Sequence, residues 1–410
     1  MGIHGLTGAL RALALSAVFA AVSLVASVGP VGAASTIDFL AALSDSELDE
    51  FRAWKEARNV FSDRTDAYWD AVEAKRQTRR KKRTAKIPFD QSDYVMSLPP
   101  KYTGPTLSAA LAKKYYDFVE HQKTTEPAKE RELATVSDYL EAAKRVYGFT
   151  PERVSEREFK LRYAEEAHAL GLSKEQVVRV YALETGGNGT YDMQSGIHPI
   201  KKTGRAISSA LGYAQLLDAN SINELARSGE TFISLINQKL RDPANSPART
   251  AALKRKLAVL KRMYANVKRL PFEWSVQQRY AKTDTGMGIH TLNIDADIGP
   301  MLQAMKLRTL KDTAEKQGRR SLSGAELELM NLAGPTTGLE MMQEPGSSAP
   351  TTNFFARRAY YVNKMVIGLT GAQLQLELDR RMTQAIIRPG AQEFAEAFDS
   401  VYARRSTAER

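Results

Sequence analysis

The chain has 410 residues, a formal net charge of +11 and no cysteine. This length is enough for one large domain and a smaller one. The absence of cysteine excludes disulfides, thiol catalysis and lipidation at a cysteine side chain. The five histidines are scattered without ligand-like spacing. We therefore predict neither a metal site nor a cofactor.

The first 34 residues have the pattern of a secretory signal peptide. Arg11 and the amino terminus precede an apolar run from Ala12 to Val28, and small residues up to Ala34 follow. This pattern is typical of export and predicts a periplasmic or extracellular protein. The apolar run also approaches spanning length, so an uncleaved membrane anchor is the alternative. No transmembrane helix is expected after signal cleavage.

Two helical segments and a linker are predicted next. Apolar positions with helical spacing predict an N-terminal helical module over residues 35–74 and a second helical segment over residues 106–149. Residues 75–105 are predicted to be a basic and Pro-rich linker. Residues 75–86 carry eight basic and no acidic side chains. That run is either solvated or adheres to a polyanion such as an anionic envelope surface. Nucleic acid is not expected, because an exported protein would not meet it.

Residues 150–378 are predicted to form the main domain, and residues 379–410 a C-terminal helical tail. Thr150 and Pro151 have the residue types of an N-cap and a first helical position, which places the start of the domain there. Helical periodicity recurs throughout, and no run alternates convincingly with the period of two that a half-buried strand requires. The predicted fold class is all-α.

Glu184 is the candidate that chemistry favours. It ends an apolar helical run that begins with a capping box of Ser173 and Gln176, and Gly186 follows where the helix would stop. Its carboxyl shares the apolar face of the helix with Tyr181. Desolvation there raises the pKa of a carboxyl, as a general acid near neutral pH requires. A glutamate that simply reaches water is the alternative.

Four short segments follow one another along the main domain: Glu184-Thr185, Ser209–Leu217, Leu329–Pro335 and Ala356–Asn363. In this order they resemble segments of the soluble lytic transglycosylases and the goose-type lysozymes. Those proteins carry a helix-end Glu-Ser pair, a Gly-Leu-Met-Gln-like turn, an Ala-Tyr-Asn-Ala-Gly-like segment and a Thr-Arg-x-Tyr-Val-like helix. The resemblance implies a lysozyme-like helical catalytic domain without a cofactor.

The resemblance also implies roles for single residues. Glu184 would act as the only general acid and base, and Thr185 keeps the hydroxyl of the family's serine. Gln215 stands where the family contacts sugar. Asn331 either binds an N-acetyl group or ties down a loop.

Aromatic residues are further candidates for the sugar site. Tyr191, Tyr213 and Tyr361 are candidates for stacking on sugar or contacting the acid, with core packing as the alternative. Tyr361 is favoured among them because it matches the tyrosine of the Thr-Arg-x-Tyr-Val-like helix. Met330 replaces the family's usual tyrosine, whose hydroxyl Tyr360 or Tyr361 would have to supply.

The implied reaction is cleavage of the β-1,4 bond between N-acetylmuramic acid and N-acetylglucosamine in peptidoglycan glycan strands. Lytic transglycosylases resemble one another in using one Glu, while the 6-hydroxyl of the substrate closes an anhydro ring. Ordinary glycosidases need a second carboxylate, and Asp192 is the candidate for it in a lysozyme-like or chitinase-like hydrolase. The loss of tyrosine at Met330 also leaves a catalytically inactive wall-binding scaffold open.

Overall fold

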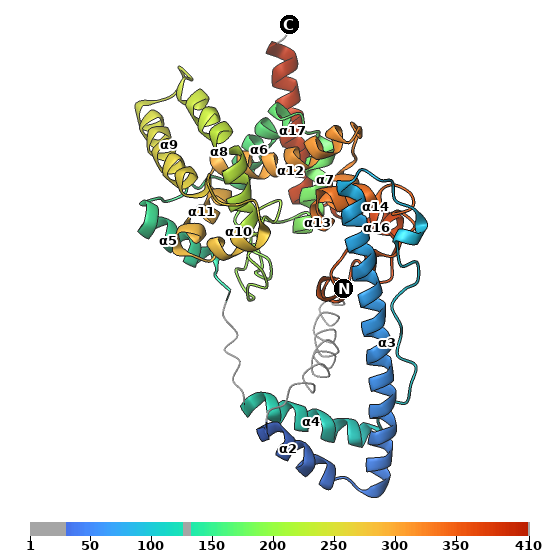
Figure 1. Ribbon diagram of the computed structural model, residues 1–410. Helices are drawn as coiled ribbons and strands as arrows, with labels where there is room; N and C mark the ends of the chain where they lie inside the picture. The colour runs from blue at the N-terminus through green and yellow to red at the C-terminus, as the bar shows by residue number, and fades with distance from the viewer. Residues whose placement is uncertain (1–29, 126–132, 409–410) are drawn as a thin grey trace, which may run out of the picture. The chain divides into compact units, whose positions relative to one another are not determined.

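Residues 30–125 and 133–408 are described by the computed structural model, and across them the regular secondary structure is helical (Figure 1). The predicted all-α class is confirmed, and β-structure in this part of the chain is limited to four isolated bridges. Residues 1–29 lie outside the described part, so the signal peptide over residues 1–34 stays a prediction. Within the described ranges, no helix combines the length and the apolar character that crossing a membrane requires.

The chain divides into two compact units. Unit 1 comprises Met1–Ala74 and Pro99–Arg131, and unit 2 comprises Lys75–Leu98 and Glu132–Arg410. These boundaries differ from the predicted segments, because contacts between distant parts of the chain, rather than changes in composition, define them.

Unit 1 contains α2 (Pro30–Ala41), the first part of α3 (Asp45–Thr84) and α4 (Ala109–Thr125). Helix α3 begins at a reciprocal cap. The Ser44 hydroxyl accepts the Glu47 N–H at 3.3 Å, and the Glu47 carboxylate accepts the Ser44 N–H at 3.0 Å. The three helices meet through aromatic rings whose centroids lie 4.6–5.9 Å apart: Phe39, Phe51, Trp54, Tyr115 and Phe118.

Unit 2 contains the end of α3 and most of the other helices. They are α5 (Val136–Tyr147), α6 (Glu156–Ala169), α7 (Lys174–Thr185), α8 (Asp218–Leu240), α9 (Pro247–Val267), α10 (Trp274–Ala281), α11 (Asp284–His290), α12 (Ile298–Lys316), α13 (Gly324–Ala333), α14 (Pro335–Met341), α15 (Arg357–Val362), α16 (Gly371–Ala385) and α17 (Pro389–Ala408). Three 3-10 turns are η2 (Gln91–Asp93), η3 (Thr291–Ile294) and η4 (Thr351–Asn353). Helix α12 packs against α6, α8 and α13, and α7 packs against α13, α16 and α17.

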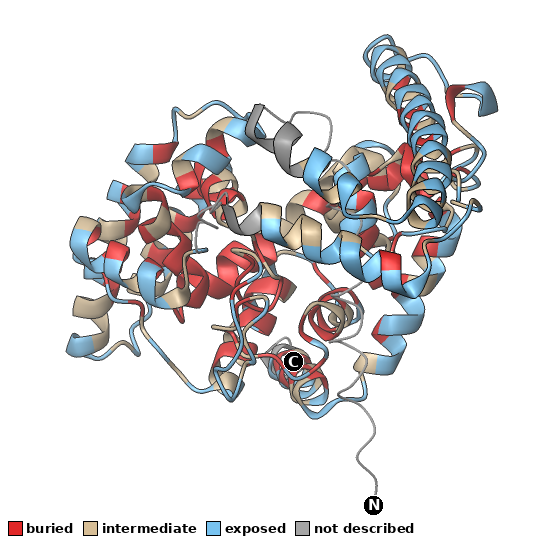
Figure 2. Cartoon of the chain, turned by 90° about the horizontal axis from the view of Figure 1, so that it is seen from below, coloured by how far each residue is buried: buried red, intermediate tan, exposed pale blue. Residues whose placement is uncertain are grey.

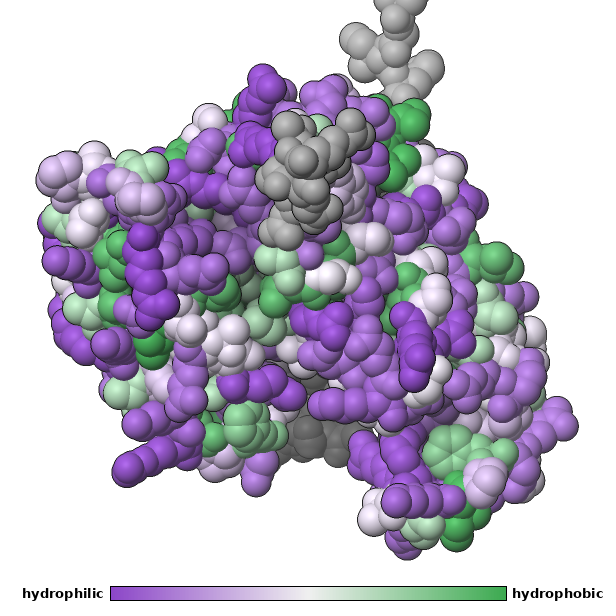
Figure 3. Space-filling view, turned by 90° about the horizontal axis from the view of Figure 1, so that it is seen from above, coloured by the Kyte–Doolittle hydropathy of each residue, from purple (hydrophilic) through white to green (hydrophobic). Residues whose placement is uncertain are grey.

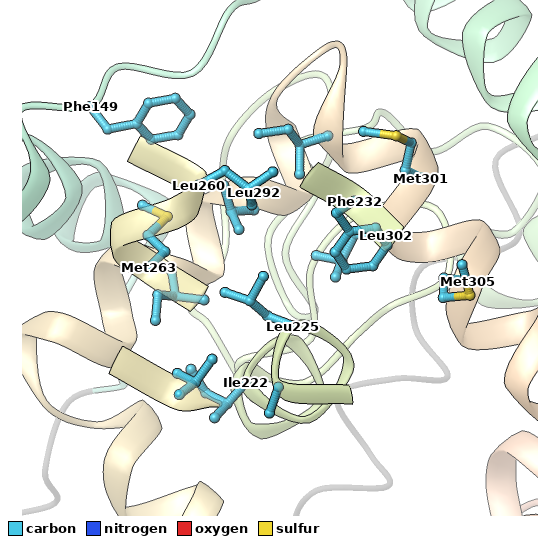
Figure 4. Close-up of a cluster of buried hydrophobic side chains, with 14 of the residues drawn as sticks. Phe149, Ile222, Leu225, Phe232, Leu260, Met263, Leu292, Met301, Leu302 and Met305 are labelled. Atoms are coloured by element: carbon cyan, nitrogen blue, oxygen red, sulfur yellow. The ribbon is translucent and has the colours of Figure 1, made fainter. Parts of the chain in front are cut away.

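A buried apolar cluster fills the space among α8, α9, α11 and α12 (Figure 4). Helix α5 reaches the same cluster through Ala143 and Tyr147. For this reason α5 belongs to unit 2, although its sequence lies in the segment predicted to precede the main domain. The side chains labelled in Figure 4 are Phe149, Ile222, Leu225, Phe232, Leu260, Met263, Leu292, Met301, Leu302 and Met305.

A second set of buried rings joins α7, α17 and the turn at Tyr213, and Tyr163 of α6 contacts the latter two. Tyr181, Tyr213 and Phe394 lie with their ring centroids 4.8–5.6 Å apart, in edge-to-face or tilted arrangements. Phe394 comes from α17 and is fully buried. The C-terminal helix is therefore part of the core of unit 2, and the predicted boundary at residue 379 is not seen.

The predicted helix start at Thr150 is wrong. Helix α6 begins at Glu156 with Ser155 as its N-cap. The preceding segment is tied to a distant one, because the Glu152 N–H donates to the Asp295 carboxylate at 2.8 Å. This tertiary hydrogen bond satisfies the Glu152 N–H, which near a helix start would have needed a side-chain cap or water instead.

Exposed and buried residues are sorted as expected for packed helices. Figure 2 shows buried positions on the inward faces of the helices and exposed positions on their outward faces. The face drawn in Figure 3 is mostly hydrophilic, with hydrophobic residues in small separate groups. Isolated apolar side chains of this kind are normal on a protein surface and need no partner.

The basic run over residues 75–86 differs from the predicted linker. It continues α3 as far as Thr84, and most of its cations have partners within unit 2. The cations with partners are Lys75, Arg76, Arg79, Lys82 and Arg83. Arg80, Lys81 and Lys86 are exposed. Only these three leave their charge free for a polyanion.

Arg79 is the centre of this attachment. Its side chain is 3% exposed and its Nε lies 2.8 Å from the Glu340 carboxylate, which is 6% exposed. Its other nitrogens donate to the carbonyls of Asp93 at 2.8 Å and Asn353 at 2.6 Å. The guanidinium also lies over the Tyr94 ring, 4.4 Å from the centroid. A buried cation is tolerated here because every face of it has a partner.

We expect Arg79→Ala to lower the free energy of unfolding by about 3–5 kcal/mol, because it leaves the Glu340 carboxylate buried without its main cation. The matched control is Arg80→Ala, which removes the same side chain from the exposed face of the next position and should change stability by less than about 0.5 kcal/mol. Chemical unfolding monitored by circular dichroism measures both. Equal effects of the two substitutions would contradict the role assigned to Arg79.

Candidate active site

Helices α7 and α13 position the candidate acid. Both begin with a capping box: Ser173 with Gln176, as the sequence predicts, and Ser323 with Glu326. Figure 1 shows the two helices next to each other in unit 2, in agreement with their packing. Each helix is thus started locally, and contacts between the two helices then align them.

The amino-terminal ends of α7 and α13 are hydrogen-bonded to each other. The Glu175 carboxylate accepts the Gly324 N–H at 2.9 and 3.0 Å, which also places a negative charge at the amino terminus of α13. The Gln176 amide donates to the Leu322 carbonyl at 2.8 Å. Because these contacts join the starts of both helices, later residues of α7 lie opposite later residues of α13. Glu184 near the end of α7 consequently meets α13.

The group that Glu184 meets is a second carboxyl, Glu328. The two carboxyls share one neighbour, the Asn331 amide, which lies within 3.5 Å of both. The Asn331 amide donates to Glu184 Oε1 at 3.3 Å and lies 3.4 and 3.5 Å from the Glu328 oxygens. Glu328 is 2% exposed, whereas Glu184 and Asn331 keep part of their surfaces accessible. The site is therefore a carboxyl pair with one member open to solvent.

Burial governs the protonation of this pair. It raises the pKa of Glu184 to about 7, and the hydrogen bond from Glu328 partly opposes the rise. Burial, followed by repulsion from Glu184, raises the pKa of Glu328 well above its ordinary range. Two adjacent buried carboxyls cannot both ionise at moderate cost. The pair therefore holds at least one proton at neutral pH.

Lys306 on α12 is a cation that interacts electrostatically with the Glu328 carboxyl. Burial lowers the pKa of Lys306, and interactions with Glu224 and Glu328 partly restore it. Glu224 is itself 2% exposed, and burial raises the pKa of its carboxyl. Lys306 thus offsets charge on two carboxyls, and it does not neutralise the Glu184–Glu328 pair alone.

Glycine at position 187 brings α16 against the end of α7. Its φ is +76°, and a Cβ atom there would lie 2.3 Å from the Ala385 carbonyl oxygen. The position therefore requires glycine on both conformational and steric grounds. The close approach covers the helix end beyond Glu184 with protein instead of water.

Gln215 lies in a strained turn that is anchored to α12. Its φ is +42°, a conformation that a non-glycine residue rarely adopts. The side-chain amide oxygen of Gln303 accepts the Ala214 N–H at 3.0 Å and fixes the turn. The Gln215 amide donates to the Gly212 carbonyl at 2.7 Å. Its nitrogen is thus used locally, and the predicted sugar contact stays a prediction.

The side chains of three other predicted site residues, Thr185, Tyr191 and Tyr213, are hydrogen-bonded within the protein interior. The Thr185 hydroxyl donates to the Tyr181 carbonyl at 2.7 Å. Tyr191 is 6% exposed, and its hydroxyl donates to the Val154 carbonyl at 3.0 Å. Tyr213 is 1% exposed, and its hydroxyl donates to Glu156. For both tyrosines the core-packing alternative fits the structure, because neither presents a ring to solvent.

The tyrosine pair on α15 differs in exposure. Tyr360 is buried, and its hydroxyl accepts the Gly368 N–H at 2.9 Å. Tyr361 is 45% exposed. In the described part of the chain, no hydrogen bond joins either hydroxyl to Glu184. Met330 is fully buried beside Glu328 in α13, so the position of the family's tyrosine is occupied by core packing.

Asp192 is held by cations. Arg153 lies 2.7 Å and Lys202 2.9 Å from its oxygens, and the Thr190 hydroxyl donates at 2.7 Å. Burial acts to raise the pKa of Asp192, but these hydrogen bonds and charges outweigh it and hold the pKa below the ordinary value. Among the described residues no hydrogen bond joins Asp192 to Glu184. The carboxyl that faces Glu184 is Glu328.

Two surface hollows lie elsewhere. One of about 450 Å³ is lined by residues between Ala53 and Arg64 of α3 and by residues 100–104, all in unit 1. The other, of about 400 Å³, is lined by residues between Lys364 and Arg381. Neither includes Glu184. The carboxyl is reached through its own partly exposed surface.

No protein-family model matches the chain, and neither a curated protein nor a solved structure does. The resemblance to lytic transglycosylases and goose-type lysozymes therefore stays a prediction. A functional proposal therefore depends on the geometry of the site.

Sequence analysis missed Glu328. The available signal was its spacing, because Glu328 and Asn331 are three residues apart in one predicted helix and so share a face. A buried glutamate on an apolar face near the implied sugar ligand Asn331 could have been paired with Glu184. Sequence alone, however, does not reveal which helix lies opposite.

We expect the pH dependence of stability to report the protonated pair. A carboxyl with a raised folded-state pKa stays protonated where the unfolded chain has already ionised. Its contribution is complete below about 4.5, the ordinary value, and is lost as pH rises through about 7. Glu184→Gln should therefore gain stability over the parent between pH 4.5 and 8, by up to about 3 kcal/mol at about 1.36 kcal/mol per pKa unit.

Asp192→Asn is the control with the opposite sign. Because the folded-state pKa of Asp192 is lowered, its contribution is present at neutral pH and is lost on acidification. The deficit of this variant relative to the parent should shrink as pH falls below 4. Denaturant unfolding at several pH values measures both differences. A pH-independent difference for Glu184→Gln would show that the carboxyl is not held protonated.

Proposed function

We propose that the protein cleaves the β-1,4 glycosidic bond of peptidoglycan as a lytic transglycosylase, with Glu184 as the single general acid and base. The observation that carries the proposal is a partly exposed glutamate at a helix end, whose carboxyl has its pKa raised to about 7 by burial. Such a group can donate a proton at neutral pH and accept one back. The four sequence segments that resemble lytic transglycosylases supply the substrate class.

The proposed reaction conserves protons within the site. Protonated Glu184 gives its proton to the glycosidic oxygen as the bond from that oxygen to C1 of N-acetylmuramic acid breaks. The resulting carboxylate then removes the proton from the 6-hydroxyl of the same sugar. That oxygen bonds to C1 and closes the 1,6-anhydro ring, so no water is consumed and Glu184 ends protonated.

The arrangement of carboxyls favours this reaction over hydrolysis. A two-carboxylate glycosidase places its carboxyls about 5–9.5 Å apart, on opposite sides of the bond. The Asn331 amide lies 3.3 Å from Glu184 and 3.4 Å from Glu328, so the two carboxyls are too close for a sugar to fit between them. Asp192, the predicted second carboxylate, is paired with Arg153 and Lys202. Neither acid is placed to activate a water on the far face of the sugar.

Export and adhesion to the envelope belong to the same proposal. The charge pattern at the start of the chain supports export. Adhesion to an anionic surface through residues 75–86 would rest on Arg80, Lys81 and Lys86, because the other cations of the run are already paired. A catalytically inactive wall-binding scaffold is the outcome expected if the parent protein binds wall and does not solubilise it.

We expect Glu184→Gln to reduce the release of soluble fragments from purified peptidoglycan by about 10²–10⁴-fold, because glutamine keeps the shape of the side chain but transfers no proton. Binding of the variant to insoluble wall should be retained. Release at more than about a tenth of the parental rate would contradict the assignment of Glu184 as the acid.

The products decide between the two reactions. Mass analysis of fragments from the parent should show anhydro ends, which lack one water relative to reducing ends. Asp192→Asn should give the same products at a rate within a few-fold of the parent. Reducing ends from the parent, lost in Asp192→Asn, would overturn the single-acid reaction in favour of hydrolysis.

A further inference from the structure

Glu328 is a buried carboxyl that the proposed reaction does not use as acid or base. It is 2% exposed, and the Asn331 amide lies within 3.5 Å of both its carboxyl and that of Glu184, the group assigned to the chemistry. We propose that Glu328 is a positioning residue that keeps its proton and donates a hydrogen bond to Glu184, so that only Glu184 exchanges protons with the substrate. This inference rests on the proposed function and specifies how the Glu184 carboxyl is held in its site.

The unequal exposure of the two carboxyls decides which one carries the charge. A carboxylate loses more hydration when its surroundings exclude water on all sides. Glu328 is nearly inaccessible, whereas Glu184 keeps contact with solvent. When the pair gives up one proton, the negative charge is therefore less costly on Glu184. Protonated Glu328 then faces it as a donor.

The groups around Glu328 agree with this assignment. From α7 it faces Glu184, from α12 it interacts with Lys306, and from its own helix the Asn331 amide approaches it. Helices α14 and α16 also pack against α13, and among the described residues they add no charged contact to Glu328. Lys306 is the sole cation in this set, and it also interacts with Glu224.

The Asn331 amide fixes the geometry of the pair. It donates to Glu184 Oε1 at 3.3 Å while lying 3.4 Å from Glu328 Oε2. With Asn331 on one side and the Glu328 hydroxyl on the other, the Glu184 carboxylate has two donors. The charge that forms on Glu184 after it has protonated the leaving group is thus stabilised before the 6-hydroxyl is deprotonated.

The test compares two substitutions of Glu328 with different hydrogen-bonding ability. In Glu328→Gln the amide imitates the protonated carboxyl, because it still donates to Glu184 and accepts from Asn331. In Glu328→Met the side chain has similar length but neither donates nor ionises. A positioning donor is replaceable by glutamine and not by methionine, whereas an acid or base is replaceable by neither.

The first readout is the titration of Glu184, followed by ¹³C NMR of protein labelled at glutamate carboxyls and assigned by comparison with Glu184→Gln. We expect Glu328→Gln to leave the titration of Glu184 close to that of the parent. Glu328→Met should move it upward by about one to two pKa units, the loss of one hydrogen bond to a charged group at about 1.36 kcal/mol per unit. Identical titrations in the two variants would overturn the proposal.

The second readout is the pH profile of fragment release from peptidoglycan. Glu328→Gln should keep the parental profile with a rate within about three-fold, and Glu328→Met should shift the profile upward with the titration. A Glu328→Gln protein as inactive as Glu184→Gln would make Glu328 an acid or base itself and overturn its positioning role. If the parent releases no fragments, the proposed function fails, and the NMR titration still decides the role of Glu328.

Discussion

The pairing of α7 with α13 is the constraint on which the candidate site depends. Glu175 binds the first backbone N–H of α13, and Gln176 binds the carbonyl just before it. These contacts set the register of one helix along the other. A change of one residue in this register would rotate a facing side chain by about 100°, since the helix has 3.6 residues per turn. The contact between Glu184 and Glu328 thus depends on hydrogen bonds made about two and a half turns earlier along α7 and about one turn earlier along α13.

Packing around this helix pair supplies the desolvation that its chemistry needs. Helix α12 covers one side of α13, while α16 and α17 cover α7. The approach of α16 is possible because position 187 is glycine, and α17 brings Phe394 into contact with Tyr181. The C-terminal helix therefore contributes to the electrostatics of a site near the middle of the chain. This explains why a helix that composition alone assigns to a tail is part of the same folding unit.

What could be predicted from the sequence follows the range of the interactions. The all-α class and the capping boxes at Ser173 and Ser323 depend on residues three positions apart, and the sequence shows both members. The sequence predicts a linker at Arg79 because the neighbouring residues are cations. In the structure, Arg79 forms an ion pair with Glu340 and donates hydrogen bonds to the carbonyls of Asp93 and Asn353. Glu328 was missed for the same reason. Its partner comes from another helix, and periodicity identifies a buried face without identifying what covers it.

The pKa values of two buried carboxyls, Asp297 and Glu328, are shifted in opposite directions. Asp297 is 1% exposed at its side chain but has Arg249, Arg162 and Lys256 around it, and these cations hold the pKa of Asp297 low despite burial. Glu328 is as deeply buried and has only the partly desolvated Lys306 near it, so burial raises the pKa of Glu328 well above its ordinary range. Burial alone therefore does not decide the charge of an acid here; the supply of cations does. Cations are abundant in this chain, and their scarcity around Glu184 and Glu328 is what leaves a transferable proton at that place.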